Sequence, residues 1–182
     1  MNLAMDNKLL EHFKLASNTD LHHGMQWYRD AHNFCLKVAK WTRQPLFRVV
    51  GVMSALSPRN KWGRNKIDTI ELIRKRKRGK YATFNNNRDK AIKILNAKDE
   101  KEVIAILSGM KTVSFYKNIL RPYKNDTVTV DIWAMRSVGL DKLNKTSYNA
   151  TQDAYRRVSN KLGIKAHELQ AIIWSVVRQG SK

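Results

Sequence analysis

The sequence predicts an all-α fold, a single compact bundle of about eight to ten helices arranged in one lobe or two. Three observations support this fold class. The chain has only three prolines and eight glycines and no Ser/Gly-rich linker, a composition that favours helices. Its apolar residues recur with helical spacing along most of its length, and the one strand-like run, 128–130, cannot form a sheet alone. At 182 residues the chain can bury one core of ordinary size, so we expect one domain over residues 1–182.

The N-terminal part predicts two helices separated by a loop. The first covers residues 6–16, with Asp6 as its N-cap, because Asp accepts a backbone N–H of the first turn. The polar stretch 17–24 predicts a loop, and a long amphipathic helix follows it and extends towards Pro45. Three aromatic residues of this second helix are expected in the core: Trp27, Tyr28 and Trp41.

The third helix is expected over residues 46–56, where the apolar run is nearly continuous. Pro45 suits its first turn. A helix that is apolar on all sides belongs in the core. It ends at Ser57, because the residue before Pro58 is pushed out of the α region.

The rest of the chain alternates polar loops with amphipathic helices. A polar loop, 59–63, leads into a fourth helix that ends in five basic residues, 74–78, with Gly79 as its C-cap. The polar run 85–87 is expected to be a loop, and Asp99 is expected to cap a later helix. Another helix is expected after Lys111 and stops before Pro122, and the remaining helices are expected over residues 88–96, 99–107, 131–139, 147–162 and 166–179.

The chain is strongly basic, and this limits what it binds. Lys and Arg total 35 against 15 Asp and Glu, a net charge of +20. Self-repulsion on this scale costs stability, so a polyanionic partner explains it best. Nucleic acid fits because Lys and Arg contact phosphates, although charge alone does not distinguish DNA from RNA. An anionic membrane surface, or a high pI without functional meaning, are the alternatives.

The single cysteine, Cys35, excludes an intrachain disulfide, a four-thiolate zinc site and a cysteine-ligated iron–sulfur cluster. It indicates a reducing compartment, and we expect a cytoplasmic protein. The N-terminus lacks the pattern of a signal peptide, and no stretch approaches the ~20 apolar residues that cross a bilayer. We therefore expect a soluble protein without a membrane partner, a metal ion or a cofactor.

The segment 107–136 concentrates the residues that suggest chemistry. Gly109 and Lys111 precede an apolar helix, and the β-branched run 128–130 leads directly into Asp131. A carboxylate at the end of a stiff, apolar run is held in position. Each residue also has a plainer explanation. Asp131 is suited to cap the helix that follows it, and Lys111 to be one more solvated or phosphate-contacting lysine.

Two pieces of this segment, Leu107-Ser108-Gly109-Met110-Lys111 and Val130-Asp131-Ile132-Trp133-Ala134-Met135-Arg136, resemble the helix-hairpin-helix superfamily of base-excision DNA glycosylases. In that family a Gly-rich hairpin grips a DNA phosphate, and an Asp follows in a pattern like V-D-x-H-x-x-R. Members that also cleave the strand carry a Lys just after the hairpin. The chain looks most like a diverged branch found in phages and bacteria. It departs from the pattern in having one hairpin glycine and Trp133 in place of the usual His.

The resemblance implies a glycosylase-like domain over residues 1–182 with Asp131 and Lys111 as catalytic residues. A glycosylase extrudes its target base, because the glycosidic bond is unreachable inside the stack. Asp131 would stabilise the developing sugar cation and orient the nucleophile. Lys111, as a neutral amine, would attack the sugar carbon and form a Schiff base.

Other residues are candidates for contacts with DNA. Gly109 would contact a phosphate, and Arg136 would contact a phosphate or form an ion pair. The loop before the fourth helix mixes donors with an aromatic ring, which suits insertion into a distorted duplex or a clamp on its backbone. Its candidate residues are Arg59, Asn60, Lys61, Trp62 and Arg64. Trp62 would alternatively fold onto the core, and the run 74–78 is either a solvated helix end or a DNA contact. Trp133 and Trp174 are the candidates to line a base pocket.

The leading hypothesis is a monomeric DNA glycosylase that acts on double-stranded DNA, with or without AP lyase activity. One alternative is a catalytically inactive, glycosylase-like DNA-binding protein. Another is a phage enzyme that remodels modified bases, and an RNA-directed activity is also compatible with the charge.

Overall fold

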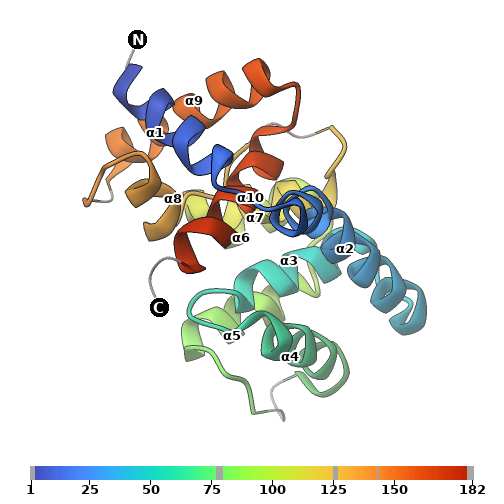
Figure 1. Cartoon of the computed structure of the whole chain (residues 1–182). Coiled ribbons are helices and arrows are strands. Elements are labelled where there is room, and N and C mark those ends of the chain that lie inside the picture. The colour runs from blue at the N-terminus through green and yellow to red at the C-terminus, as the bar shows by residue number, and fades with distance from the viewer. Residues whose placement is uncertain (1–2, 77–79, 125–126, 143, 180–182) are drawn as a thin grey trace. The chain divides into compact units, whose positions relative to one another are not determined.

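The computed structural model describes residues 3–76, 80–124, 127–142 and 144–179 (Figure 1). Within these ranges the chain is all-α, as predicted, with ten helices and no strand. The helices are α1 Leu3–Lys14, α2 Asn18–Thr42, α3 Leu46–Leu56, α4 Trp62–Lys75, α5 Asn85–Ile94, α6 Glu100–Leu107, α7 Met110–Leu120, α8 Ile132–Ser137, α9 Lys145–Leu162 and α10 Ala166–Gln179. None of them combines the length and the apolar composition that a membrane span requires.

The chain forms two compact units. Unit 1 consists of Met1–Asp30 and Pro122–Lys182, and unit 2 consists of Ala31–Arg121. Helix α2 is continuous across the boundary between them.

Unit 2 is built around α3, which packs against α4, α5, α6 and α7. Every residue from Val49 to Leu56 is buried, which confirms the prediction of a core helix. Gly51 permits this packing, because a Cβ there would lie 2.8 Å from Ile94 and 2.7 Å from Val103. The predicted end at Ser57 is also confirmed, since Ser57 is the C-cap of α3. The expected reason is wrong, however, because Ser57 keeps α-helical angles, with a φ of −69° and a ψ of −30°.

Unit 1 buries the facing sides of α1, α8, α9 and α10. Its core includes Leu9, Met135, Tyr155, Leu169 and Ile173. The extended run Val128–Val130 is buried in the same unit and runs directly into α8.

Asp6 is not an N-cap, as the sequence analysis expected, but a buried ion-pair partner within α1. Its side chain is 2% exposed, and both carboxylate oxygens accept hydrogen bonds from the Arg157 guanidinium on α9, the shortest of them 2.7 Å long. The Lys161 ammonium lies 3.9 Å from the same carboxylate. Helix α1 begins at Leu3, three residues before the predicted start at Asp6, so Asp6 lies within the helix.

Replacing Arg157 by Met is expected to lower the free energy of unfolding by about 3 kcal/mol, because the buried Asp6 carboxylate then loses its bidentate partner. Urea denaturation followed by circular dichroism measures the change. Arg156→Met is the matched control, since Arg156 pairs at 3.3 Å with Asp153, which is exposed. Equal losses in the two variants would show that the buried pair contributes no more than the surface pair.

The polar stretch 17–24 is also not a loop. Helix α2 begins at Asn18, and Ser17 and Asp20 cap its start reciprocally: Ser17 Oγ accepts from the Asp20 N–H, and the Asp20 carboxylate accepts from the Ser17 N–H. Gly24 lies within this helix and is buried. A Cβ on Gly24 would lie 2.3 Å from Ile172 Cγ1, so the glycine allows α2 and α10 to pack closely within unit 1.

Smaller differences concern helix starts and one aromatic residue. Helix α5 begins at Asn85, so the predicted loop 85–87 is helical, and α4 begins at Trp62. The proposed C-cap Gly79 and residues 77 and 78 lie outside the described residues. Tyr28 is buried as expected, and Trp27 is half-buried. Trp41 is 60% exposed, so the prediction that it belongs to the core is wrong.

Candidate active site

The extended run before Asp131 is fixed by hydrogen bonds from other elements of unit 1. The Tyr148 hydroxyl on α9 donates to the Val128 carbonyl at 3.1 Å and accepts from the Val130 N–H at 3.4 Å. Gln152 Nε2 donates to the same carbonyl at 2.8 Å. The Tyr28 hydroxyl on α2 donates to Thr129 Oγ1 at 3.0 Å. These bonds hold the extended backbone in one conformation.

Asp131 follows this run as the N-cap of α8. Its Oδ1 accepts the Ala134 N–H at 2.9 Å, so the plainer of the two predicted roles is present. The side chain is half-buried. None of the described residues donates a hydrogen bond to Oδ2. One oxygen therefore fixes the carboxylate, and the other remains available.

A buried pair of hydroxyl groups, from Ser137 and Tyr155, joins α8 to α9. The Ser137 hydroxyl donates to the Ala134 carbonyl at 2.7 Å and lies 2.8 Å from the Tyr155 hydroxyl of α9. Burial raises the pKa of Tyr155, the Asp131 charge raises it further, and the Ser137 hydrogen bond opposes both. Tyr155 is consequently a neutral donor close to the Asp131 charge.

The sequence analysis did not single out Tyr148 or Tyr155. A usable signal was present, because the two lie seven residues apart on one face of a predicted helix. Buried tyrosines normally find a partner for their hydroxyl groups.

Two candidate base-pocket residues lie in the same unit as Asp131. The Arg136 guanidinium lies 5.5 Å from the centre of the Trp133 ring, and the Arg178 guanidinium lies 4.5 Å from that of Trp174. Both rings are half-buried, and Arg136 is exposed. Each tryptophan thus pairs an aromatic ring with a cation at the surface of unit 1.

The predicted hairpin is a two-residue connection between α6 and α7 in unit 2. Ser108 adopts the left-handed conformation with a φ of 58°, whereas Gly109, with a φ of −86°, is the N-cap of α7. Lys90 on α5 donates to the Leu107 carbonyl at 3.2 Å and to Ser108 Oγ at 3.1 Å. The turn is therefore tied to its unit by a neighbouring helix.

Lys111 lies in the first turn of α7 and is exposed. Its apolar neighbour Met110 is itself 41% exposed and does not bury the amine. Lys111 belongs to unit 2 and Asp131 to unit 1, and the structure does not place the two side chains relative to one another.

The loop before α4 is organised by a residue of α4 itself that the sequence analysis missed. Asp68 is fully buried and accepts hydrogen bonds from Asn60 Nδ2 at 3.0 Å, Arg64 Nε at 2.7 Å and the Ala82 N–H at 2.9 Å. Arg64 also donates to the Lys80 carbonyl at 3.1 Å. Asn60 and Arg64 were predicted to bind DNA, and in the structure their side chains join the loop and the segment 80–82 to α4.

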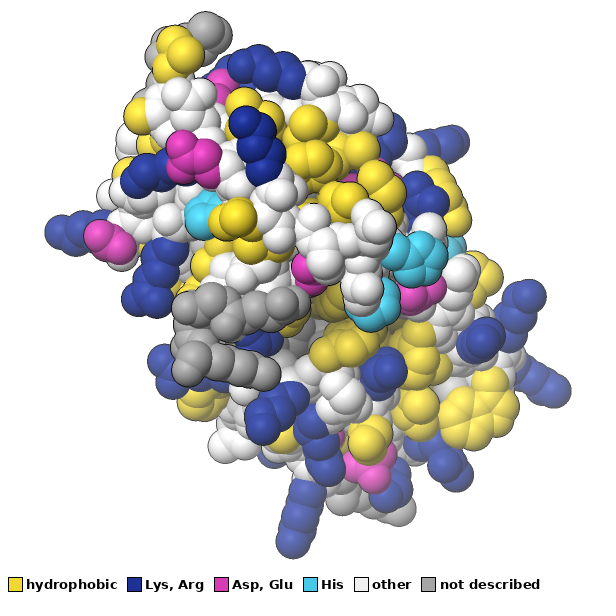
Figure 2. Space-filling view, in the orientation of Figure 1, with side chains coloured by type: hydrophobic (Ala, Val, Ile, Leu, Met, Phe, Trp, Pro, Cys, Tyr) yellow, Lys and Arg dark blue, Asp and Glu magenta, His cyan; other side chains and the backbone are white. Residues whose placement is uncertain are grey.

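The other residues of that loop face outward to different degrees. Lys61 is exposed, and Trp62 is half-buried in the first turn of α4. Arg59 is also exposed, and its guanidinium lies 5.6 Å from the centre of the Phe84 ring, which is 57% exposed. Figure 2 shows that Lys and Arg side chains project from much of the visible surface.

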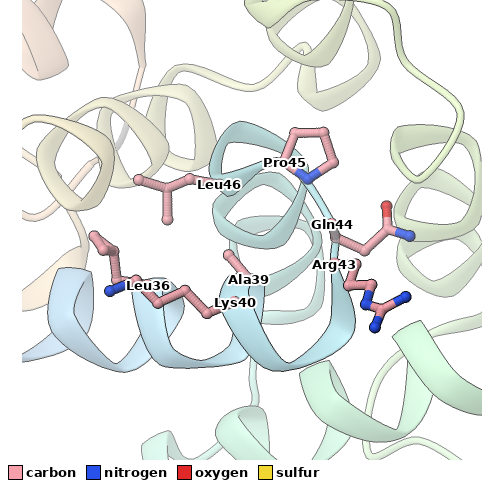
Figure 3. A pocket seen from close by; sticks show the side chains of 7 residues that line it. All are labelled: Leu36, Ala39, Lys40, Arg43, Gln44, Pro45 and Leu46. Atoms are coloured by element: carbon pink, nitrogen blue, oxygen red, sulfur yellow. The ribbon is translucent and has the colours of Figure 1, made fainter.

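A shallow hollow of about 390 Å³ lies in unit 2, between the C-terminal part of α2 and the start of α3 (Figure 3). None of the predicted site residues lines it. It is lined by Leu36, Ala39, Lys40, Arg43, Gln44, Pro45 and Leu46. In the described part of the chain, no group of three or more His, Cys, Asp or Glu side chains is arranged to hold a metal ion.

The fold and these residues define an all-α, strongly basic protein with a fixed carboxylate at a helix start. Residues 2–181 match a family of unknown function, DUF7178, and the chain belongs to this family. No curated protein and no solved structure matches the chain.

Proposed function

We propose that the protein is a DNA glycosylase that removes a damaged or modified base from double-stranded DNA. The observation that carries this proposal is the position of Asp131, a carboxylate held at one oxygen by the Ala134 N–H and approached by a rigid, buried run. The net charge of +20 supports a polyanionic substrate.

The carboxylate suits the chemistry of base excision. As the glycosidic bond breaks, positive charge develops on the sugar, and a fixed negative charge stabilises it without reorganisation. Oδ2 of Asp131, which accepts no hydrogen bond from the described residues, is the oxygen that would face the sugar or orient a water molecule. Trp133 and Trp174 would contact the extruded base, and Arg136 would contact a phosphate.

The direct test is incubation with duplexes that carry uracil, an oxidised purine or an alkylated purine, followed by detection of free base. Release of at least one of these bases is expected. A folded protein that releases none of them across a broad panel would sink the proposal.

Lyase activity depends on Lys111. If its amine attacks the sugar, borohydride will trap a covalent protein–DNA adduct, and Lys111→Gln will abolish the adduct. Lys101→Gln is the matched control, because Lys101 is another exposed lysine of unit 2, on α6. An adduct that survives in Lys111→Gln, or that disappears equally in the control, contradicts the role of Lys111.

The second candidate is a DNA-binding protein without catalysis, favoured by the exposure of Lys111 and by the short, single-glycine turn. Here Asp131→Asn would change neither binding nor any cellular effect, and affinity would still fall steeply with salt. An enzyme that remodels modified bases would instead act only on DNA that carries such bases.

A further inference from the structure

Unit 2 carries three contacts between a basic side chain and an aromatic ring along one side of α4. Lys66 Nζ lies 5.7 Å from the ring centres of both Phe34 and Trp62, and the Arg74 guanidinium lies 5.4 Å from that of Trp41. These residues of α2 and α4 form what we call the aromatic–basic face.

The contacts define how the two helices run. Phe34 and Trp41 are seven residues apart on α2, and Lys66 and Arg74 are eight apart on α4, so each pair spans about 10–12 Å along its helix. Phe34 contacts Lys66, and Trp41, further along α2, contacts Arg74, further along α4. The two helices therefore run side by side in the same direction. The face is consequently an elongated track, not an isolated cluster.

One ring of this face is open to a partner. Trp41 is 60% exposed, whereas Phe34 and Trp62 are half-buried. An exposed indole ring offers a flat apolar surface on which a planar group can stack. The cation beside it favours an anionic partner that also has planar groups.

Positive charge predominates around the face. From Ala31 to Thr42, α2 contains Lys37 and Lys40 and no acidic residue. The acidic residues of α4 are Asp68, which is fully buried, and Glu71, whose carboxylate lies 3.3 Å from Lys75 Nζ. Figure 2 shows dark-blue side chains around hydrophobic ones on the part of the surface that α2 and α4 form. The partner is therefore a polyanion.

The backbone conformation of three arginines independently indicates a functional site in this part of unit 2. Among the described non-glycine residues, those with positive φ are Ser108 and three exposed arginines, Arg43, Arg59 and Arg76. Arg43 follows the end of α2, and Arg76 is the C-cap of α4. Glycine avoids the cost of roughly 1–2 kcal/mol that other residues incur there. Arginine side chains at these ends place further positive charge beside the track, and strain of this kind clusters at functional sites.

We infer that the aromatic–basic face binds single-stranded DNA, with an unpaired base stacked on Trp41 and with phosphates contacted by Arg43, Lys66, Arg74 and Arg76. Bases within a duplex are already stacked on one another, so exposed rings select unpaired strands. The choice of DNA over RNA rests on the proposed function. The hollow beside this end of α2, with Lys40 and Arg43 in its lining, extends the basic surface (Figure 3).

The test is fluorescence anisotropy with the full-length protein and one labelled sequence as single-stranded DNA, duplex DNA and single-stranded RNA. Trp41→Ala is expected to weaken binding of the single strand about 5- to 150-fold and to leave duplex binding almost unchanged. Arg74→Gln should reduce the slope of log K against log salt for the single strand by about 0.7.

Tyr123→Ala is the matched control, because Tyr123 is a 61% exposed ring in unit 1 that also lies beneath an arginine, Arg29, at 5.2 Å. It should bind the single strand as tightly as the wild type does. An unchanged affinity in Trp41→Ala, an equal loss in Tyr123→Ala, or an equal loss for duplex would overturn the inference. Tighter binding of RNA than of DNA would overturn the choice of DNA.

The two proposals fail separately. Asp131→Asn should bind the single strand as tightly as the wild type, since Asp131 lies in unit 1. If no base is released but Trp41→Ala binds single-stranded DNA more weakly than the wild type, only the glycosylase proposal fails. If a base is released but Trp41→Ala binds single-stranded DNA as tightly as the wild type, only the inferred binding site on the aromatic–basic face is wrong.

Discussion

Asp131→Asn is expected to slow base release about 10²- to 10³-fold, the usual loss when one fixed electrostatic contact to a transition state is removed. The folded state should be almost unaffected. Asn is as good an N-cap as Asp, so its side-chain oxygen will still accept the Ala134 N–H, which Asp131 now accepts at 2.9 Å. The substitution thus removes the charge and keeps the cap. Single-turnover release of free base, compared at equal concentrations of folded protein, measures the effect.

Asp99→Asn is the control for this experiment. Asp99 is the N-cap of α6, and its Oδ1 accepts the Glu102 N–H at 2.9 Å, the same arrangement at the same distance. It has no proposed role in chemistry, so its rate should match that of the wild type. If Asp131→Asn retains full activity, or if both variants slow equally, Asp131 is a helix cap and nothing more.

Gly24→Ala is expected to destabilise the protein by about 3 kcal/mol. The added Cβ would lie 2.3 Å from Ile172 Cγ1 and 2.6 Å and 2.7 Å from the Ile172 backbone N and Cα. A side chain alone could rotate away, but the backbone of α10 can yield only if the helix shifts within the core of unit 1. The loss should appear as a lower urea midpoint.

Gly63→Ala provides the comparison, because Gly63 is helical and has nothing within 4 Å of the position of a Cβ. Alanine is the better helix former, so this variant should be unchanged or more stable by up to about 1 kcal/mol. A Gly24→Ala protein as stable as Gly63→Ala would show that α2 and α10 do not pack as closely as the structure has them.

Helices with complete local signals were predicted well. The run 46–56 lies between two prolines and is apolar except for Arg48 and Ser54, and α3 occupies those residues. The cap at Asp99 was confirmed, as were the bounds of α10, where amphipathic spacing is strong. In each case the information lies within a few neighbouring residues.

Two of the errors arose where a distant contact decides the structure. Asp6 looked like a cap, yet its partner Arg157 is 151 residues away. Gly24 looked like a break, yet it serves packing against Ile172. The capping box of Ser17 and Asp20 was readable in the sequence and would have corrected the start of α2.

Some features of the candidate site could likewise be predicted from local sequence, and others depend on distant contacts. The rigid lead-in to Asp131 could be predicted because a β-branched run is stiff by itself. The side chains that fix this run, Tyr148 and Gln152, come from α9, and no local pattern connects them to it. Asp68 was likewise missed, because its role depends on three donors that the fold brings together.

The most direct test of the proposed activity is chromatographic detection of free base after incubation with the panel of modified duplexes, with wild type and Asp131→Asn side by side. The wild type should release at least one base in excess of the enzyme, and Asp131→Asn should release it at least about 100-fold more slowly. No release by a folded wild-type protein, or equal release by both proteins, would contradict the assignment of Asp131 as the catalytic carboxylate of a DNA glycosylase.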